Sequence, residues 1–406
     1  MFLRKRKYDS TGSLSKLAWI RFRRNKVSFS SLVFIGLVAL LSIVGYWITP
    51  DKTPMVNEQN LLLATLKPGS KVTVLKVCKN QDIPTRNIFH KLLYGQENKY
   101  QSYPLSSYRF SSDSIIITEY SKDSSGLEIG FHLANVCYPL YEKSGSKKQG
   151  NLISFISLDG KQIKTSVEEL RKQITEENIV QKAFILGTDR YGRDVLSQLI
   201  IGTRVSLSVG FISVAISLLI GIFLGAIAGY FGGKIDALIS WFINIVWAVP
   251  TLLLVIAITF ALGKGFWQVF VAVGLTMWVE VARVVRGQFM SLREKEFVEA
   301  ARALGYRNFR IIFKHILPNA MAPVIVISAA NFASAILLEA GLSFLGIGVQ
   351  PPMPSWGGMI KENYAYIILD YAYLAILPGL AIMIMVLAFM LIGNGLRDAL
   401  DVRTVD

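Results

Sequence analysis

Long apolar stretches almost free of charge are the feature that most constrains how this chain of 406 residues can fold. Hydrophobic residues make up 52% of the sequence and charged residues only 17%, whereas a soluble domain usually carries about 25% charged residues. The charge deficit is concentrated in stretches that are long enough to cross a bilayer as a helix. The chain is therefore predicted to be a polytopic membrane protein, mostly α-helical, with about six transmembrane helices.

The first apolar stretch, at 28–48, follows a basic N-terminus at 1–27 that holds nine lysines and arginines against one acid, Asp9. A cleaved signal peptide begins in the same way, but its apolar core is only about 7–15 residues long. The stretch is therefore predicted to be a retained helix. Five more spans are predicted at about 205–231, 235–260, 266–286, 318–345 and 373–396.

Two features of these spans bear on how they pack. Gly221, Gly225 and Gly229 form a small-residue face suited to close helix packing. The stretch at 235–260 contains Pro250, which a membrane helix tolerates where neighbouring helices satisfy the freed carbonyl. We therefore expect 235–260 to be a single span.

The net charge of +15 is distributed unevenly among the loops. Six basic residues lie in the loop at 287–317, whereas the loop at 346–372 carries only Lys361. Cytoplasmic loops are enriched in lysine and arginine, so 287–317 is predicted to be cytoplasmic, with both termini on the same side. Nucleic-acid binding, the alternative reading of a basic chain, would need basic residues among exposed aromatics on a soluble domain, and the sequence lacks that pattern.

The polar segment at 49–186 is long enough for a small folded domain, and the alternation of spans places it outside the cytoplasm. We expect this insert between the first two spans to be mixed α/β. Its predicted strands lie at 71–77, 114–118, 151–158 and 161–164.

Two local signals in the insert are specific. Asp159-Gly160 predicts the turn of a hairpin between the last two strands. Ser166 and Glu169 fit a capping box that opens a short helix ending at about Glu177.

The chain has two cysteines, Cys78 and Cys137, and both lie in the insert. Either they are unrelated buried thiols or they form one disulfide, since connectivity cannot be deduced from sequence. No group of cysteines and histidines has the spacing of a zinc site, so no metal is expected.

The cytoplasmic loop at about 294–318 carries the strongest pattern. Residues 294–304 favour a helix, and Gly305 permits the left-handed conformation that ends one. Asn308 is predicted to cap a second helix that Pro318 ends. In that helix an apolar stripe follows the spacing i, i+3, i+4 and i+7, through Phe309, Ile312, Phe313 and Ile316. The stripe either lies against the bilayer or the chain's own bundle, or docks a cytoplasmic partner.

The loop resembles the EAA loop of ABC importer permeases. The residues that carry the resemblance are Glu299, Ala300, Ala301, Gly305, Leu317 and Pro318. The string His315-Ile-Leu-Pro-Asn319 is similar to the peptide-importing branch, and so are two further strings. These are Leu186–Asp189 with Gly192–Asp194 and Ser197, and Glu339 with Leu342–Gly346 and Pro351–Gly357. The resemblance covers 185–402 closely and 1–50 loosely, and the insert at about 51–184 exceeds the family pattern. We therefore expect a permease domain at 187–402 after the insert domain at 49–186.

The resemblance implies the type I ABC importer permease fold and a subunit of a larger transporter in a bacterial inner membrane. A second permease would complete the path for di- and oligopeptides, two ATPases would sit beneath it, and a binding protein would deliver peptide from outside. Glu299 and Gly305 would be the ionic and hinge-like elements that couple the loop to the ATPases. From the apolar stripe we add Phe309, Ile312 and Phe313 as contacts.

The chain itself is not expected to be an enzyme or to bind a cofactor, with ATP-Mg held by the partner ATPases. A phosphate-binding loop needs the pattern G-x-x-x-x-G-K-[ST]. The nearest candidate, Gly233-Lys234, has Ala228 in place of the first glycine and Ile235 in place of the hydroxyl residue.

Three charged residues lie in or at the ends of spans: Glu280, Arg283 and Glu339. Such groups are costly in a membrane and usually face the bundle interior or a water-filled path. Glu280 and Arg283 could form a structural pair at i, i+3. Because Glu339 has no local partner in the sequence, we expect it to act in gating or in contact with another subunit. The same role is open to Glu280 and Arg283.

Two other functions stay open at this level. A relative in the same branch could import nickel or another solute. Alternatively, the chain could be a membrane-anchored signalling or assembly protein whose insert is the working part. The exact substrate, the partners and the role of the insert are not specified by the sequence.

Overall fold

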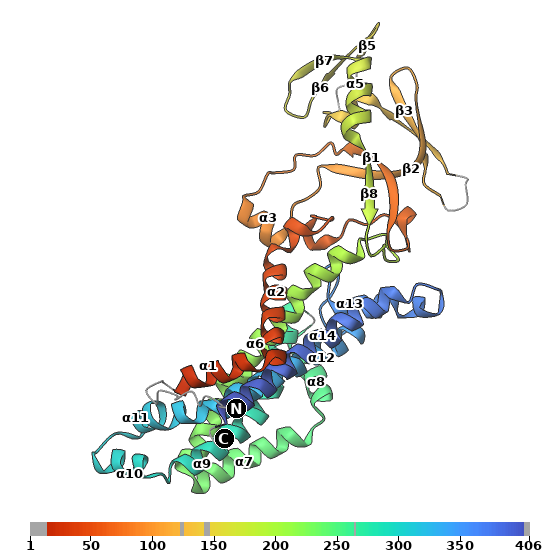
Figure 1. Cartoon of the computed structure of the whole chain (residues 1–406). Helices are drawn as coiled ribbons and strands as arrows, with labels where there is room; N and C mark the ends of the chain where they lie inside the picture. The colour runs from red at the N-terminus through yellow and green to blue at the C-terminus, as the bar shows by residue number, and fades with distance from the viewer. Residues whose placement is uncertain (1–13, 122–125, 142–146, 264, 402–406) are drawn as a thin grey trace, which may run out of the picture. The chain divides into compact units, whose positions relative to one another are not determined.

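The structure is a computed structural model that describes residues 14–121, 126–141, 147–263 and 265–401 (Figure 1). Residues 1–13 of the predicted basic N-terminus lie outside the described residues. The chain divides into two compact units. The helical unit comprises Met1–Ser42, Gly202–Lys361 and Ala375–Asp406, and the insert unit comprises Ile43–Ile201 and Glu362–Leu374.

Five helical segments in the described ranges are long and apolar enough to cross a membrane, or six if a bent pair counts as one span. The prediction of about six spans is confirmed. The segments are α2 (Lys26–Ile48), α6 (Val195–Phe231), α9 (Phe266–Leu292), the run Asn308–Phe344 that ends in α12 (Leu317–Phe344), and α14 (Tyr373–Leu400). A basic helix, α1 (Leu14–Arg24), precedes α2.

The bent pair corrects the expectation of a single helix at 235–260. Helices α7 (Gly233–Ala248) and α8 (Thr251–Leu262) meet at 94°. The cause is Pro250, which has no N–H and disfavours the helical conformation in the residue before it. Val249 is accordingly extended, with φ −84° and ψ 131°.

The glycine face of α6 packs directly on α9. A Cβ added to Gly221 would lie 2.5 Å from Cβ of Val281, and one added to Gly229 would lie 2.5 Å from Cβ of Phe289. Val281 and Phe289 are fully buried. Because these glycines have no side chains, α6 can approach α9 closely at their positions.

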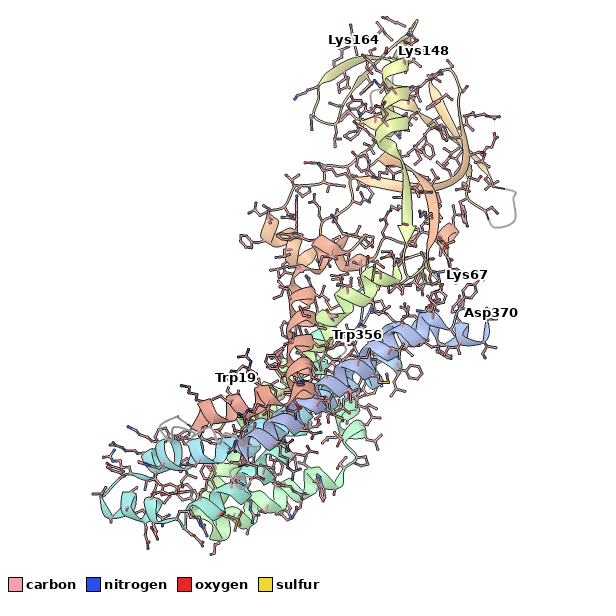
Figure 2. All side chains as sticks on the ribbon, in the orientation of Figure 1. Trp19, Lys67, Lys148, Lys164, Trp356 and Asp370 are labelled. Atoms are coloured by element: carbon pink, nitrogen blue, oxygen red, sulfur yellow. The ribbon has the colours of Figure 1, made fainter. Side chains whose placement is uncertain are left out.

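The insert unit contains two antiparallel sheets. The five-stranded sheet has the order β4-β3-β2-β1-β8 and the three-stranded sheet the order β5-β6-β7. Their bounds are β1 Ser70–Cys78, β2 Tyr100–Phe110, β3 Ser114–Glu119, β4 Glu128–His132, β5 Lys147–Gln149, β6 Leu152–Ile156, β7 Gln162–Ser166 and β8 Ile179–Phe184. Lys148 and Lys164 mark β5 and β7 in Figure 2.

The predicted local signals of the insert are confirmed. Gly160 has φ +76° in the turn between β6 and β7. Both hydrogen bonds of the capping box between Ser166 and Glu169 are present at the start of α5 (Val167–Gln173). The short helices of the insert, α3 (Ile88–Tyr94), α4 (Leu133–Cys137) and α5, complete a mixed α/β domain. Its core includes Leu75, Ile117, Leu133 and Ile153, all fully buried.

The structure corrects the disulfide alternative, because Cys78 and Cys137 are free thiols. The two residues are close, but the Sγ of Cys78 points at the carbonyl oxygen of Cys137, 3.2 Å away. The Sγ of Cys137 turns instead toward the carbonyl of Leu170. Burial raises the pKa of Cys78 to about 11 and that of Cys137 to about 12, so both thiols stay protonated near neutral pH.

Candidate coupling loop and charged sites

The loop between α9 and α12 begins with α10 (Glu296–Ala303), which ends just before Gly305, as predicted. Gly305 has φ +75° and donates its N–H to the carbonyl of Arg302, while Tyr306 donates to the carbonyl of Ala301. This is the paired hydrogen-bond pattern of a glycine helix end. A Cβ added to Gly305 would meet nothing within 4 Å, so backbone conformation alone requires glycine here.

The second helix of the loop differs from the prediction in two respects. Arg307, not Asn308, precedes the first helical residue, and Asn308 instead accepts a hydrogen bond from the hydroxyl of Tyr230. Pro318 does not end the helix, which continues from α11 (Asn308–Arg310) through a π-helical turn at Ile311–Ile316 into α12. The proline follows this π-helical turn, as the second residue of α12.

The π turn also divides the predicted apolar stripe. Ile312 and Ile316 are buried, whereas Phe309 is 72% exposed and Phe313 is 47% exposed. The rings of the two phenylalanines lie 4.4 Å apart, centroid to centroid. One extra residue per turn rotates successive side chains around the axis, so the stripe separates into an inner pair and an outer pair.

Four side chains of the loop are exposed: Glu299, Leu304, Phe309 and Phe313. Phe309 and Phe313 line a groove with Phe223 and Phe231 of α6. Within the described ranges no ion pair involves Glu299. Exposed aromatic side chains are suited to docking another protein.

The other predicted contact residues differ in exposure. Ala300 and Pro318 are exposed, Ala301 is buried and Leu317 is half-buried.

The inner side of the loop is fixed to the spans. Val298, Ile311 and Ile316 are fully buried in one core with Phe289 of α9. The hydroxyl of Tyr230 on α6 lies 2.8 Å from Oδ1 of Asn308. The loop is therefore held against both α6 and α9 by packed contacts.

Glu280 and Arg283 do not form the structural pair considered from sequence. Arg283 donates to Oδ1 of Asn244 at 3.0 Å and lies 3.8 Å from the ring centroid of Trp247. Glu280 is exposed on α9, and none of the ion pairs between described residues includes it. An ion pair that sequence reasoning missed joins α7 and α9, where Arg286 Nη2 donates to Asp236 Oδ2 at 2.7 Å.

Glu339 is fully buried in α12, and its Oε1 accepts a hydrogen bond from the hydroxyl of Ser343 at 2.6 Å. It does not reach the surface of this conformation, so it makes no direct subunit contact there. A role for Glu339 in gating stays a prediction. Nearby, Trp356 (Figure 2) is buried at the start of α13 (Trp356–Asn363) and packs 3.0 Å from a Cβ built on Gly202.

The polar string before α6 folds as a hydrogen-bonded turn. Asp189 accepts hydrogen bonds from the side chains of Arg193 and Gln198, and Arg193 also pairs with Glu362. Asp194 caps α6 by accepting from the N–H of Ser197 at 2.8 Å. The string thus has a structural role in starting the second span.

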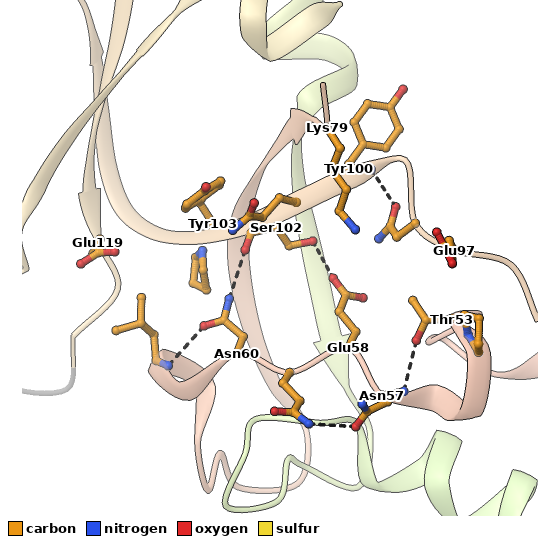
Figure 3. A pocket seen from close by; sticks show the side chains of 16 residues that line it. Thr53, Asn57, Glu58, Asn60, Lys79, Glu97, Tyr100, Ser102, Tyr103 and Glu119 are labelled. Atoms are coloured by element: carbon orange, nitrogen blue, oxygen red, sulfur yellow. Dashed lines mark hydrogen bonds between the residues drawn. The ribbon is translucent and has the colours of Figure 1, made fainter. Parts of the chain in front are cut away.

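The insert unit contains an open polar pocket of about 660 Å³ (Figure 3). The loop after α2 forms one wall and β2 another. Glu58 accepts from Lys182 at 2.9 Å and from the hydroxyl of Ser102 at 2.8 Å, and Asn60 donates to the carbonyl of Ser102. Glu97 and Glu119 add carboxylates to the wall and Lys79 adds an ammonium group, so the pocket carries charges of both signs.

Comparison with known proteins matches both ends of the chain. Residues 221–406 match the family described as "Binding-protein-dependent transport system inner membrane component". Residues 13–68 match "N-terminal TM domain of oligopeptide transport permease C". Residues 69–220, which include most of the insert, lie outside both matches.

Among individual relatives, the chain is 46% identical over 215 residues to the dipeptide transport system permease protein DppC of Alkalihalophilus pseudofirmus. That match covers 53% of this chain and 70% of the relative. It is 42% identical to the glutathione transport system permease protein GsiD of Pectobacterium atrosepticum, over 53% of this chain and 71% of the relative. It is 40% identical to the oligopeptide transport system permease protein OppC of Bacillus subtilis, over 53% of this chain and 70% of the relative.

The spans, the helix–turn–helix loop and these matches define a multi-pass membrane permease subunit of an ABC transporter. The chain belongs to the family of binding-protein-dependent transport system inner-membrane components, in its dipeptide and oligopeptide permease branch. This family consists of the membrane permease subunits of such transporters, and the ATPase is a different subunit.

Proposed function

We propose that this chain and a second permease together form the path by which an ATP-driven importer moves di- and oligopeptides across a bacterial inner membrane. The names of the dipeptide, oligopeptide and glutathione permeases that it resembles support the substrate class. The observation that carries the proposal is that Phe309, Phe313 and Glu299 are exposed on a loop whose buried side packs on α6 and α9.

In this proposal the loop docks in a groove on an ATPase subunit. Phe309 and Phe313 bury their rings in the groove, and Glu299 pairs with a cation on the ATPase. When two ATPases close on ATP-Mg, the loop moves and carries α6 and α9 with it through Tyr230 and the buried core. Rigid-body rocking of the spans then alternates access to the path.

The proposed orientation has both termini in the cytoplasm and the insert outside, because the basic loops would then lie on the inner side. An extracytoplasmic binding protein would deliver the peptide. We assign the insert to contacts on that outer side, where the polar pocket of Figure 3 is one candidate surface.

The test is ATP-driven uptake in proteoliposomes that contain this chain, its second permease, both ATPases and the binding protein. The expected result is accumulation of a radiolabelled dipeptide that requires ATP and stops when this chain is omitted. Uptake of radiolabelled nickel in place of dipeptide would show the substrate class to be wrong. ATP-independent uptake would show the importer assignment to be wrong.

A further inference from the structure

A pocket of about 320 Å³ lies where α7 and α8 bend apart, and α9 and α12 close its other sides. Glu280, Thr276 and Ser334 place polar groups in its wall, and Trp247 contributes an aromatic ring. The volume is at the lower end of the range for small-ligand sites, about 300–1,000 Å³. Substrate sites in transporters are often built where a membrane helix is broken, as α7–α8 is here.

The carboxylate of Glu280 is available to a ligand at this pocket. Glu280 is exposed in the wall and makes no ion pair with any residue that the structure describes. Arg283, one turn along α9, does not line the pocket, and its guanidinium is held by Asn244 and by the ring of Trp247. Glu280 is thus the charged residue among those that line the pocket.

The exposed carboxylate of Glu280 also makes lipid an unfavourable neighbour for this side of α9. An exposed carboxylate within a span is costly against hydrocarbon and is normally found facing a water-filled path or another protein. By contrast, the exposed side chains of α6 include Leu219, Phe223 and Phe231, which suit lipid. The pocket side of α9 is thus the side that faces the path or the second permease.

We propose that Glu280 is the charged contact for the α-ammonium group of a short peptide in transit, which rests on the proposed function and adds a site to it. The carboxylate of Glu280 accepts hydrogen bonds from the α-ammonium group. Thr276 and Ser334 add polar groups to the same wall of the pocket.

The test uses the complete complex in nanodiscs without the binding protein, so that only the permease discriminates between ligands. A photoreactive dipeptide is compared with an analogue in which hydrogen replaces the α-amino group. We expect the free-amine peptide to crosslink to the α9 fragment about tenfold more than the analogue in wild type. This preference should disappear in Glu280→Gln and persist in Glu280→Asp, which keeps the charge.

Glu294→Gln is the matched control, because Glu294 is an exposed glutamate at the end of α9 and outside the pocket. It should keep the wild-type preference. An equal preference in wild type and Glu280→Gln, in complexes that retain all subunits, would overturn the inference, as would crosslinking confined to the second permease. Failure of the wild type to import any peptide would instead reject the proposed function, and the uptake assay detects that separately.

Discussion

The hydroxyl of Tyr230, in the last turn of α6, donates a hydrogen bond of 2.8 Å to Oδ1 of Asn308, the first residue of the helix after the loop glycine. The same ring lies 5.6 Å from the guanidinium of Arg302 on α10. One tyrosine thus contacts both helices of the coupling loop. It gives α6 a direct connection to the part of the chain that is proposed to move with the ATPases.

Replacing Tyr230 with Phe should weaken this connection without emptying the core. The lost hydrogen bond is worth about 0.5–1.5 kcal/mol, which predicts a fall of about two- to tenfold in peptide imported per ATP hydrolysed. Tyr306→Phe is the control, because Tyr306 is held by its ring, which stacks on His315 and lies under Arg310. An unchanged transport-to-ATPase ratio in Tyr230→Phe would show that the bond does not couple the two parts.

Gly305→Ala should strain the loop through backbone conformation alone. At φ +75° an L-residue costs about 1–2 kcal/mol, and nothing in the structure would clash with the added methyl. We expect normal expression with reduced ATPase stimulation. Gly287→Ala is the matched control, since Gly287 also has open space around its Cα but lies inside α9. Equal effects of the two substitutions on ATPase stimulation would contradict the conformational argument.

The two thiols should react slowly in the folded protein and fully after denaturation. With pKa values of about 11 and about 12, Cys78 and Cys137 hold little thiolate near neutral pH. Mass spectrometry after iodoacetamide treatment, without reductant, should find two alkylated cysteines only when the chain is unfolded. A protein that stays unlabelled after denaturation would contain the disulfide that this structure lacks.

Asp194 predicts a specific pH dependence of stability. Burial raises the pKa of this carboxyl above 3.8, its usual value, although Ser197 donates to it. The folded state therefore binds the proton more tightly than the unfolded chain does. The resulting stabilisation is complete below 3.8 and is lost as pH rises through the raised pKa.

The corresponding measurement is the melting temperature of the detergent-solubilised chain from acid to neutral pH. Asp194→Asn keeps an acceptor for the helix cap and removes the titration, so its melting temperature should fall less as pH rises. Asp159→Asn changes an exposed turn residue and should follow wild type. An identical pH slope for Asp194→Asn and wild type would show that Asp194 is not the responsible group.

The sequence predicted the features that depend only on residues close together along the chain. The capping box at Ser166, the turn at Gly160 and the helix end at Gly305 each need only a few consecutive residues, and each is present. The spans were predictable for a similar reason, since length and apolarity suffice to identify them.

The two prolines show where local reasoning failed. Pro250 breaks its span, whereas Pro318 lies within a continuous helical run. The same residue type has opposite effects at the two positions. A π-helical turn precedes Pro318, and a pattern based on 3.6 residues per turn does not anticipate such a turn. Ile312, within that turn, is buried, whereas Phe309, before it, is exposed. The pairing of Asp236 with Arg286 depends on how α7 packs on α9, and no sequence pattern specifies it.

The most direct test of the coupling account is co-purification of the ATPases with Phe309→Ala/Phe313→Ala. Phe260→Ala is the control, because Phe260 is a comparably exposed phenylalanine on α8, outside the loop. The account predicts that wild type and Phe260→Ala retain both ATPases, while the double variant keeps the second permease and retains ATPase at about a tenth of the wild-type level or less. Full retention of the ATPases by the double variant, with unchanged ATP-driven uptake, would contradict the account.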